Sequence, residues 1–445
     1  MKLSRKNFAV LILFGIVGQI AWSMENMYFN LFIFETIEPN LNAITFMVQA
    51  SGIVATLTTL FAGTISDKIG NRRAFISIGY IIWGATVMLF GMIAPDYVAD
   101  LFNIARADAV KLCLIAVIVG DCVMTLFGST ANDAAFYAWV TDNTNSHNRG
   151  RIESILAIFP LIALLIVAGS FGIIKDAIGY KLLFILLGTI ISICGIIGLF
   201  IVKDREGLKP QGSLGDLIYG FKPSTIKGNV AYYVALIATC IYSIACQVFM
   251  PYLTIYMSQY LGFTVVEYSL VFGVAILLGA VINLFLGRLS DKVDKAKCMY
   301  VAAAVFAIGL FAMYLVRDVG PTLTVILFGI AGFVMITGYI YISALAGAIV
   351  RDLTPPEDTG KLQGVRMIFF VLIPMIVGPA IGNAINAYYD LKLPDQSSAD
   401  SMTTLFIPAP EIFLAASLIT LLLYALVPIL RRTIKSRASA EEIIK

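Results

Sequence analysis

Charged residues are scarce in this sequence. Asp, Glu, Lys and Arg make up 13% of its 445 residues, whereas 59% are hydrophobic. An ordinary soluble protein carries about 25% charged residues. The chain therefore has too few charges to cover a folded core with a hydrated surface, and its composition indicates a polytopic membrane protein.

Residues suited to catalysis or metal binding are few and dispersed. The single histidine, His147, excludes a catalytic or zinc site built from several histidines, and the six cysteines lack the spacing of a disulfide framework or a metal site. Neither a nucleophile motif nor a glycine-rich phosphate loop is present in the sequence. We expect no enzymatic activity and no cofactor, and the net charge of +3 is too small to indicate nucleic-acid binding.

Apolar runs long enough to cross about 30 Å of hydrocarbon recur along the chain. They predict an all-α protein of twelve transmembrane helices. The first run is longer than the apolar part of a signal peptide, so we expect it to remain as helix 1. The predicted helices cover residues 8–35, 42–66, 73–94, 110–140, 152–173, 182–202, 229–258, 265–288, 297–316, 321–350, 363–387 and 409–430.

A polar stretch rich in Gly, Pro and Lys follows the sixth predicted helix. We expect residues 204–228 to form a cytoplasmic linker. It would join two six-helix bundles, residues 1–203 and 229–445, the second of which ends in a short cytoplasmic tail.

A short sequence occurs once in each predicted bundle. LFAGTISDKIGNRR at Leu60–Arg73 returns as LFLGRLSDKVDKAK at Leu284–Lys297. In both copies an apolar helix ends and a short basic turn leads into the next helix. We expect the glycine of each copy to let a neighbouring backbone approach closely. The identical residues include Gly63, Ser66, Asp67 and Lys68, which recur as Gly287, Ser290, Asp291 and Lys292.

This loop resembles the signature between helices 2 and 3 of the major facilitator superfamily. The residues of the first copy that match the signature are Gly63, Asp67, Lys68, Gly70, Arg72 and Arg73. Asn71 stands where the family usually has an Arg, and the second copy has Asp294 in place of the second Gly. The resemblance implies two parallel six-helix halves, a solute site between them, and alternating access in which these loops act as gates.

A second repeat follows predicted helices 4 and 10. Asp142, Gly150 and Arg151 recur as Asp352, Gly360 and Lys361. We expect Asp142, Arg149 and Arg151 to form part of the cytoplasmic gate together with the loop residues named above.

The distribution of Lys and Arg predicts the orientation of the chain. These residues accumulate in cytoplasmic loops, and a cytoplasmic N-terminus puts about 25 of the 31 basic residues on one side. We therefore expect both termini to be cytoplasmic. The expected setting is a bacterial cytoplasmic membrane, in which a monomer has the lipid bilayer and a small solute as its partners.

Carboxylates in predicted helices 1 and 4 are the candidates for ion coupling. Glu25 and Asp121 fall at similar depth if the two helices run in opposite directions, and Asp133 lies nearer the cytoplasm. Two buried carboxylates close together cannot easily both ionise, so we expect such a pair to hold one proton. Polar residues nearby either bind solute or join helices by hydrogen bonds: Asn26, Asn30, Thr125 and Asn132.

Two stretches carry a narrower resemblance. NDAAFYAWVTD at Asn132–Asp142 resembles the glycoside–pentoside–hexuronide cation symporters, and WSMENMYF around Glu25 is similar to the sucrose-type carriers. The first group builds a sodium site from acids in helices 2 and 4. Helix 2 contains no carboxylate here, so we favour the proton as coupling ion over sodium.

The second bundle offers aromatic rings, amides and hydroxyls within its helices. Such groups suit a neutral polyol, whose faces stack on rings while its hydroxyls are hydrogen-bonded, although Tyr also packs between helices. The candidates are Tyr242, Gln247, Tyr252, Asn283, Tyr339, Tyr341, Arg366 and Asn383.

These observations favour a proton-coupled symporter of a small polar solute, most simply a sugar or glycoside. Three alternatives stay open: a sodium-coupled symporter, a proton-driven exporter of amphipathic compounds, and a sensor that transports nothing. The solute has no sequence motif of its own, because one hydroxyl or methylene changes the selectivity of a binding site.

The orientation predicts the reactivity of the linker. A cysteine placed within residues 204–228 should react only with a thiol reagent that is admitted to the cytoplasm, because basic loops stay inside. Labelling of intact cells with permeant and impermeant maleimides measures this, and reaction with the impermeant reagent would reverse the orientation.

Overall fold

A computed structural model of the chain describes residues 4–144, 149–204, 219–290, 293–317, 319–355, 359–394 and 404–444. The chain forms two compact units, Met1–Ser213 and Leu214–Lys445. The boundary between them falls inside the segment expected to be the linker.

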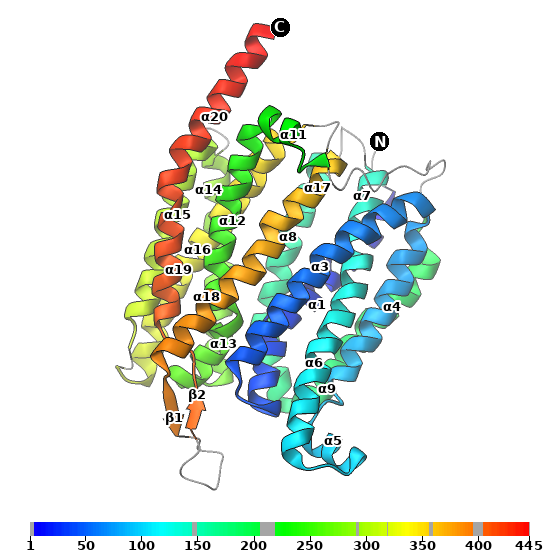
Figure 1. Cartoon of the computed structure of the whole chain (residues 1–445), viewed down its shortest axis with the longest axis vertical. Coiled ribbons are helices and arrows are strands. Elements are labelled where there is room, and N and C mark those ends of the chain that lie inside the picture. Colours follow the sequence, from blue (N-terminus) through cyan, green and yellow to red (C-terminus); the bar gives the residue numbers. More distant parts are fainter. Residues whose placement is uncertain are drawn as a thin grey trace. The chain divides into compact units, whose positions relative to one another are not determined.

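Unit 1 is a bundle of long apolar helices, coloured blue to green in Figure 1. Its helices are α1 (Arg5–Met24), α2 (Asn30–Phe32), α3 (Leu41–Ile69), α4 (Arg72–Phe90), α5 (Pro95–Phe102), α6 (Arg106–Gly128), α7 (Tyr137–Asp142), α8 (Arg149–Ile166) and α9 (Gly172–Ile201). Short π-helical segments join some of these pieces, so that α1 continues through α2 to Ile37 and α6 continues through α7 to Asp142.

The helical run Ile155–Ile201 contains two membrane crossings. As one straight helix its 47 residues would span about 70 Å, more than twice the hydrocarbon thickness of about 30 Å. The chain turns at Gly179, which has a φ of 75°. Contacts with helix 1 show the reversal. Before Gly179 the run follows helix 1 from its start toward its end, since Phe159 meets Gly15 and Phe171 meets Tyr28. After Gly179 it returns, since Tyr180 meets Phe32 and Gly198 meets Phe14. The five long apolar runs in the described part of unit 1 therefore make six crossings.

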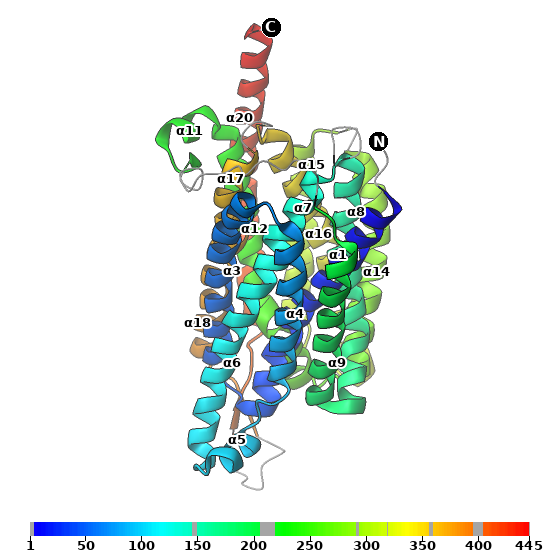
Figure 2. The same ribbon diagram turned by 90° about the vertical axis from the view of Figure 1, so that its right-hand side faces the viewer.

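Glycines bring the backbones of α4 and α9 together, and Figure 2 shows the two helices side by side. A Cβ on Gly84 would lie 2.3 Å from the Gly188 carbonyl oxygen, and a Cβ on Gly188 would lie 2.4 Å from the Gly84 carbonyl oxygen. Further along the contact, a Cβ on Gly195 would lie 2.6 Å from the Ile81 backbone nitrogen. Small residues allow this close packing in a membrane, where van der Waals contact replaces the hydrophobic effect between helices.

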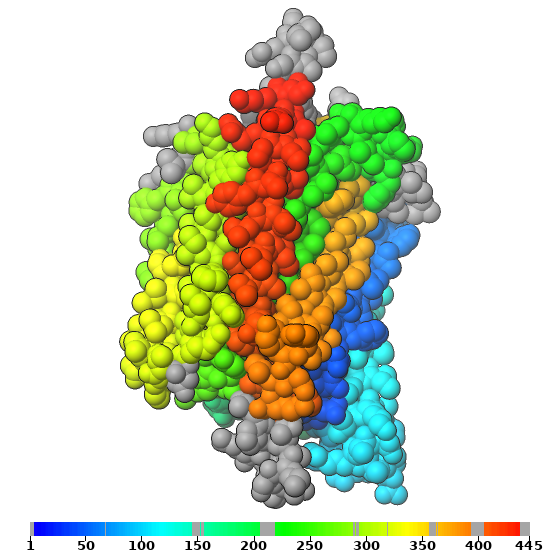
Figure 3. Space-filling view, turned by 60° about the vertical axis from the view of Figure 1, so that its left-hand side comes forward, coloured from blue at the N-terminus to red at the C-terminus, as the bar shows by residue number. Residues whose placement is uncertain are grey.

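Unit 2 adds six long apolar runs within its described residues, so the two units together make the twelve predicted crossings. Its elements are α11 (Pro223–Gly228), α12 (Val230–Phe249), α13 (Leu253–Ile255), α14 (Val265–Ser290), α15 (Lys295–Leu315), α16 (Pro321–Leu353), α17 (Thr359–Met367), α18 (Ile373–Tyr389), β1 (Lys392–Pro394), β2 (Thr404–Phe406), α19 (Glu411–Leu421) and α20 (Leu423–Ile444). In Figure 3, α19 and α20 form a continuous ridge beside α15.

Glycines also set the distance between α12 and α18. A Cβ on Gly378 would lie 2.4 Å from Gln247 Cβ, and a Cβ on Gly382 would lie 2.2 Å from the Val248 carbonyl oxygen. The two glycines are four residues apart, so they lie on one face of α18 and form the small-residue contact typical of membrane helices.

Two local elements were not predicted. The expected linker contains the short helix α11, and the loop after α18 contains the antiparallel pair β1–β2, in which Lys392 lies opposite Phe406. Both elements are three to six residues long, and neither alters the all-α class of the protein.

The contact between α4 and α9 predicts a difference between two glycine substitutions. Gly84→Ala should lower the free energy of unfolding by about 1–3 kcal/mol, because its methyl group would overlap the Gly188 backbone. Gly63→Ala is the control, since a Cβ there meets no described atom within 4 Å. Thermal unfolding of the purified protein in detergent measures both, and equal effects would contradict the close contact.

Candidate functional site

The two helices that carry the candidate carboxylates both contain π-helical segments. Helix 1 is π-helical over Glu25–Phe29, and the helix that begins as α6 is π-helical over Ser129–Phe136. A π-helical turn inserts an extra residue into the helical repeat and redirects the side chains around it, which is why such turns are frequent at functional sites. Glu25, Asn132 and Asp133 lie within these segments.

Four polar side chains from three helices meet in unit 1, and we call them the acid cluster: Glu25, Ser51, Asp121 and Thr125. The Ser51 hydroxyl of α3 donates to Glu25 Oε1 at 3.0 Å and lies 2.9 Å from the Thr125 hydroxyl. The Thr125 hydroxyl also lies 3.4 Å from Glu25 Oε1, so both hydroxyls can donate to this oxygen and either can donate to the other. The Asp121 carboxyl lies against both Glu25 and Ser51.

The acid cluster is buried and lacks a basic partner. Its residues are at most 8% exposed, and no Lys or Arg among the described residues forms an ion pair with Glu25 or Asp121. Glu25 Oε2 and Asp121 Oδ1 accept no hydrogen bond from the described residues. Burial of two unpaired negative charges is very costly, so a proton or another cation must neutralise at least one of these carboxyls.

Asp133 forms a second acidic position on the same helix. It accepts a hydrogen bond from Asn132 Nδ2 at 3.3 Å and lies beside Ser129 and the Trp22 indole. It is also close enough to Glu25 for their charges to interact.

Asn132 lies at a close contact between helices 1, 3 and 4. The Tyr80 hydroxyl lies 2.7 Å from the Phe14 carbonyl oxygen and 3.0 Å from Asn132 Oδ1. A Cβ on Gly18 would come within 2.5 Å of the same Asn132 oxygen. Asn132 therefore has a structural role here in addition to its predicted contact with solute.

The two asparagines of helix 1 differ in exposure. Asn26 is exposed and donates to the Trp22 carbonyl at 2.8 Å, whereas Asn30 is 2% exposed and donates to the Asn26 carbonyl at 3.1 Å. Asn30 Oδ1 is buried without a hydrogen bond from the described residues. Both amides thus use their donors within helix 1, and Asn30 keeps an acceptor.

In unit 2 one group of the predicted solute residues is brought together. The Tyr242 hydroxyl donates to Ser343 Oγ at 3.2 Å, and Tyr339 lies next to Tyr242. Arg366 is near Tyr242, and its guanidinium stacks 5.0 Å from the centre of the Phe370 ring. Residues from α12, α16 and α17 thus form one aromatic and polar group.

The other predicted residues of unit 2 make contacts that fasten helices. Tyr252 is fully buried, and its hydroxyl donates to the Pro379 carbonyl at 3.1 Å. Pro379 lies one turn before Asn383. Gln247 packs on Gly378. Asn283 donates to the Thr337 carbonyl of α16 at 3.1 Å, and Ser290 reaches the Tyr341 hydroxyl at 3.4 Å.

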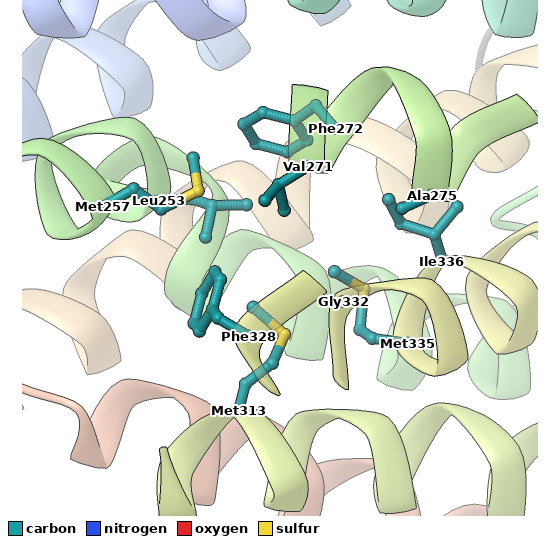
Figure 4. Close-up of a pocket in the computed structure, with 10 residues that line it drawn as sticks. All are labelled: Leu253, Met257, Val271, Phe272, Ala275, Met313, Phe328, Gly332, Met335 and Ile336. Atoms are coloured by element: carbon teal, nitrogen blue, oxygen red, sulfur yellow. The ribbon is translucent and has the colours of Figure 1, made fainter. Parts of the chain in front are cut away.

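A small cavity inside unit 2 is separate from these polar groups. Leu253, Met257, Phe328 and Met335 are among the residues that line it, and Figure 4 shows that all ten lining residues are apolar or glycine. Its free space suits about one water molecule and its walls offer that water no hydrogen bond, so the cavity has no polar contacts for a solute.

The signature loop of unit 1 is closed by an ion pair. Arg72 is 5% exposed, donates to Asp142 Oδ2 at 3.1 Å and also donates to the Ser66 hydroxyl. Gly70 ends α3 with a φ of 69°, and the Asn71 side chain accepts from the Ala74 amide at 3.0 Å as the N-cap of α4. Asn71, the departure from the family pattern, therefore starts a helix.

Neighbouring loop residues join the end of α9. The Arg73 amide donates to Asp204 Oδ1 at 3.0 Å, and its guanidinium donates to the Leu199 carbonyl, whereas Lys68 is exposed. The side chains of Asp67, Arg149 and Arg151 lie outside the described part of the chain. Their predicted roles in a gate stay predictions.

Unit 2 repeats the arrangement with different residues. Lys295 binds Asp352, the counterpart of Asp142, at 2.5 Å, and Asp294 binds Arg431 of α20 at 3.0 Å. Asp291 lies outside the described residues. The expected close approach at the loop glycines is wrong for this structure, because a Cβ on Gly63 or Gly287 would meet no described atom within 4 Å.

Sequence reasoning missed Ser51 and Tyr80. A lone serine in an apolar helix carries no signal of its own, because it usually bonds to its own helix, as Thr56 does to the Gly52 carbonyl at 2.9 Å. Tyr80 lies in the apolar helix α4, where no polar residues at helical spacing indicate a site. Both residues were identified only through their partners on other helices.

The chain belongs to the Major Facilitator Superfamily, whose sequence pattern matches residues 11–346 and 236–443. It is thus a multi-pass membrane protein of a transporter family. An uncharacterized transporter of this type from Escherichia coli (strain K12), YdeE, is 36% identical over 81 residues. That match spans 18% of this chain and 20% of YdeE.

Solved transporter structures share the fold. A variant of the nucleoside transporter NupG superposes with a TM-score of 0.68 at 12% identity, covering 95% of this chain and 99% of NupG. A bacterial homolog of the human lysosomal transporter Spinster also gives 0.68 at 12% identity, covering 97% and 98%. A bacterial metal transporter gives 0.60 at 13% identity, covering 97% and 100%. At these identities the likeness shows the fold alone.

The hydrogen bonds of the acid cluster predict unequal effects for two hydroxyl deletions in α3. Ser51→Ala should lower the free energy of unfolding by about 1–3 kcal/mol, because Glu25 Oε1 loses the closer of its two hydroxyl donors inside the bundle. Thr56→Ala should cost less, since the Gly52 carbonyl keeps its helical partner. Thermal unfolding of both variants in detergent at one pH tests this, and a larger loss for Thr56→Ala would contradict it.

Proposed function

We propose that the protein is a proton-coupled symporter of a small neutral polar solute, a sugar or glycoside. The acid cluster is the observation that carries this proposal. Its two carboxyls lie side by side and pair with no basic residue among those that the structure describes, so their charge state depends on a mobile cation. A change in that charge changes the energy of the helices around it.

The hydrogen bonds of the acid cluster support the proton over sodium. A hard metal cation needs several oxygen ligands pointing at one centre. Here the Ser51 and Thr125 hydroxyls lie 2.9 Å apart and approach Glu25 Oε1 at 3.0 Å and 3.4 Å, so they hydrogen-bond to each other and to this oxygen instead of pointing their oxygens at one centre. A proton on one of the two adjacent carboxyls needs only one acceptor, and the other carboxylate supplies it.

Coupling follows if solute prefers the protonated acid cluster. A ligand shifts a conformational equilibrium only by its difference in affinity between the two states. In the proposed cycle, protonation removes a buried charge and stabilises the conformation that binds solute. Loss of the proton on the other side of the membrane then restores the charge, weakens solute binding and releases the solute.

The solute class rests on the polar and aromatic side chains. Tyr242, Tyr339 and Arg366 of unit 2 offer ring faces and hydrogen-bond donors. Asn26 in unit 1 is exposed, and Asn30 Oδ1 accepts no hydrogen bond from the described residues. Rings, amides and hydroxyls suit a polyol better than an ion, which agrees with the resemblance to glycoside and sucrose carriers.

The proposal predicts that the acid cluster is needed for accumulation and not for exchange. Asp121→Asn or Glu25→Gln should abolish uphill uptake driven by a pH gradient and flatten its pH dependence, because the titrating group is gone. Exchange of labelled for unlabelled solute should stay measurable. Uptake into proteoliposomes under pH and sodium gradients separates the two processes.

Asp108→Asn is the matched control, since this acid lies on the same helix and is largely exposed. It should leave accumulation unchanged. If both cluster variants still concentrate solute with the original pH profile, the coupling site lies elsewhere; accumulation that follows a sodium gradient instead would identify sodium as the coupling ion.

The solute is identified by thermal unfolding against a panel of sugars, nucleosides, amino acids and amphipathic compounds. A ligand at a hundred times its dissociation constant should raise the stability by about 2.7 kcal/mol. We expect sugars or glycosides to respond. A response to amphipathic compounds alone would favour an exporter.

A further inference from the structure

The connection between α4 and α6 contains a helix that the proposed cycle does not use. Helix α5, Pro95–Phe102, lies at one end of unit 1, at the bottom of Figures 1 and 2. Tyr97, Leu101 and Phe102 are 52%, 60% and 59% exposed. Surfaces in contact with water usually expose large apolar side chains singly, whereas three of them gather on this one short helix.

The apolar residues of α5 lie on one face. Successive residues are about 100° apart around a helix, so Tyr97, Val98, Leu101 and Phe102 cover a continuous arc. Asp96 and Asp100, one turn apart, lie on the opposite side and are both exposed. The helix is therefore amphipathic, with a pattern typical of a helix that lies in the plane of a membrane surface.

The depth of α5 follows from the acid cluster. Glu25 and Asp121 lie side by side on antiparallel helices. Glu35, ten residues after Glu25, and Lys111, ten residues before Asp121, therefore lie at a similar level toward the same end of the bundle. Glu35 there binds Lys175 at 3.1 Å and accepts from the Tyr180 hydroxyl at 2.8 Å. This charged level marks the end of the apolar crossing.

Helix α5 lies just beyond that level. α6 begins at Arg106, five residues or about 7.5 Å past Lys111. The headgroup region extends a bilayer from about 30 Å to about 40–45 Å, which is several ångströms on each side. α5 packs against α6 near this start, so it lies in the outer part of the headgroup region.

Exposed apolar side chains continue from α5 along the chain into α6. They are Ile104, and Leu112, Ile115 and Val119 of α6, which is long and apolar enough to cross a membrane. The charges of this region do not attract anionic lipid: Asp96 pairs with Arg106 at 2.8 Å, Lys111 with Asp108 at 3.5 Å, and Asp100 is in excess. Apolar burial is the force available for membrane contact.

We propose that α5 is an interfacial helix that inserts Tyr97, Leu101 and Phe102 among the headgroups and upper acyl chains of the adjacent leaflet, with zwitterionic lipid as its partner. In that position α5 fixes the start of α6 relative to the bilayer. The same helix carries Asp121 and Thr125 of the acid cluster, so the membrane surface holds their helix while other parts of the chain move.

Nitroxide labels on the full-length protein in phosphatidylcholine proteoliposomes test this. Leu101→Cys samples the apolar face, Asp100→Cys the polar face, and Ile115→Cys is the reference for lipid exposure. The unsubstituted protein gives the background from its own cysteines. Collision with oxygen, which partitions into lipid, is compared with collision with a water-soluble nickel chelate present on both sides of the membrane.

The label at Leu101 should show an oxygen-to-nickel ratio several-fold higher than the label at Asp100 and closer to that at Ile115. Phe102→Cys replaces Leu101→Cys if the latter is not stable, with the same expected result. Equal nickel access at the two faces would overturn the proposal. Exclusion of both reagents together with spin–spin broadening would also overturn it, because a second copy of the chain would then cover α5. A label that enters the membrane only after phosphatidylglycerol is added would overturn the choice of zwitterionic lipid.

Discussion

Two carboxyl groups, Glu25 and Asp121, are buried together in an apolar bundle, and no basic residue in the described part of the chain pairs with them. The arrangement around them follows from that constraint. Ser51 and Thr125 bring hydroxyls from α3 and α6 because one carboxyl oxygen needs donors that do not carry charge. The π-helical turn that begins at Glu25 changes the direction of the side chains along helix 1 at this point. Such a site is stable only while a cation neutralises it, which makes its structure responsive to the composition of the water on either side.

The bundles that surround this site use two kinds of helix contact. α4 with α9, and α12 with α18, are packed backbone against backbone through glycines, so these pairs cannot slide without a steric clash. The loops at the Arg72 end of unit 1 and the Lys295 end of unit 2 are joined by ion pairs and hydrogen bonds instead. The Lys295–Asp352 pair is the more exposed of the two and can be exchanged for water at small net cost, whereas the Arg72–Asp142 pair is mostly buried and harder to break. Rigid helix pairs joined at their ends by polar contacts are what a carrier needs to move parts of each bundle as units.

Much of this architecture could be predicted from the sequence, because its signals are local. Apolar length predicted the crossings, helical spacing put Asp121 and Thr125 on one face, and a depth estimate put Glu25 opposite them. Ser51 could not be found in this way, since a serine that bonds its own helix and one that bonds a neighbour look the same in sequence. The glycines show the same limit: Gly63 stood out by repetition and meets no atom in the described residues, whereas Gly84 and Gly188 had no motif and hold two helices together. Contacts between segments distant in sequence decide these cases.

The repeated ion pairs at the ends of the two units differ in a way that matters for electrostatics. Arg72 and Asp142 have side chains 6% and 18% exposed, whereas Lys295 and Asp352 are 35% and 56% exposed. A planar guanidinium with two acceptors keeps its geometry, while an ammonium on a flexible stem is a single hydrated charge. Dissolved salt screens exposed charges strongly and buried ones weakly. Ionic strength therefore acts on the two repeats unequally, so the loop of unit 2 becomes looser in concentrated salt while that of unit 1 keeps its stiffness.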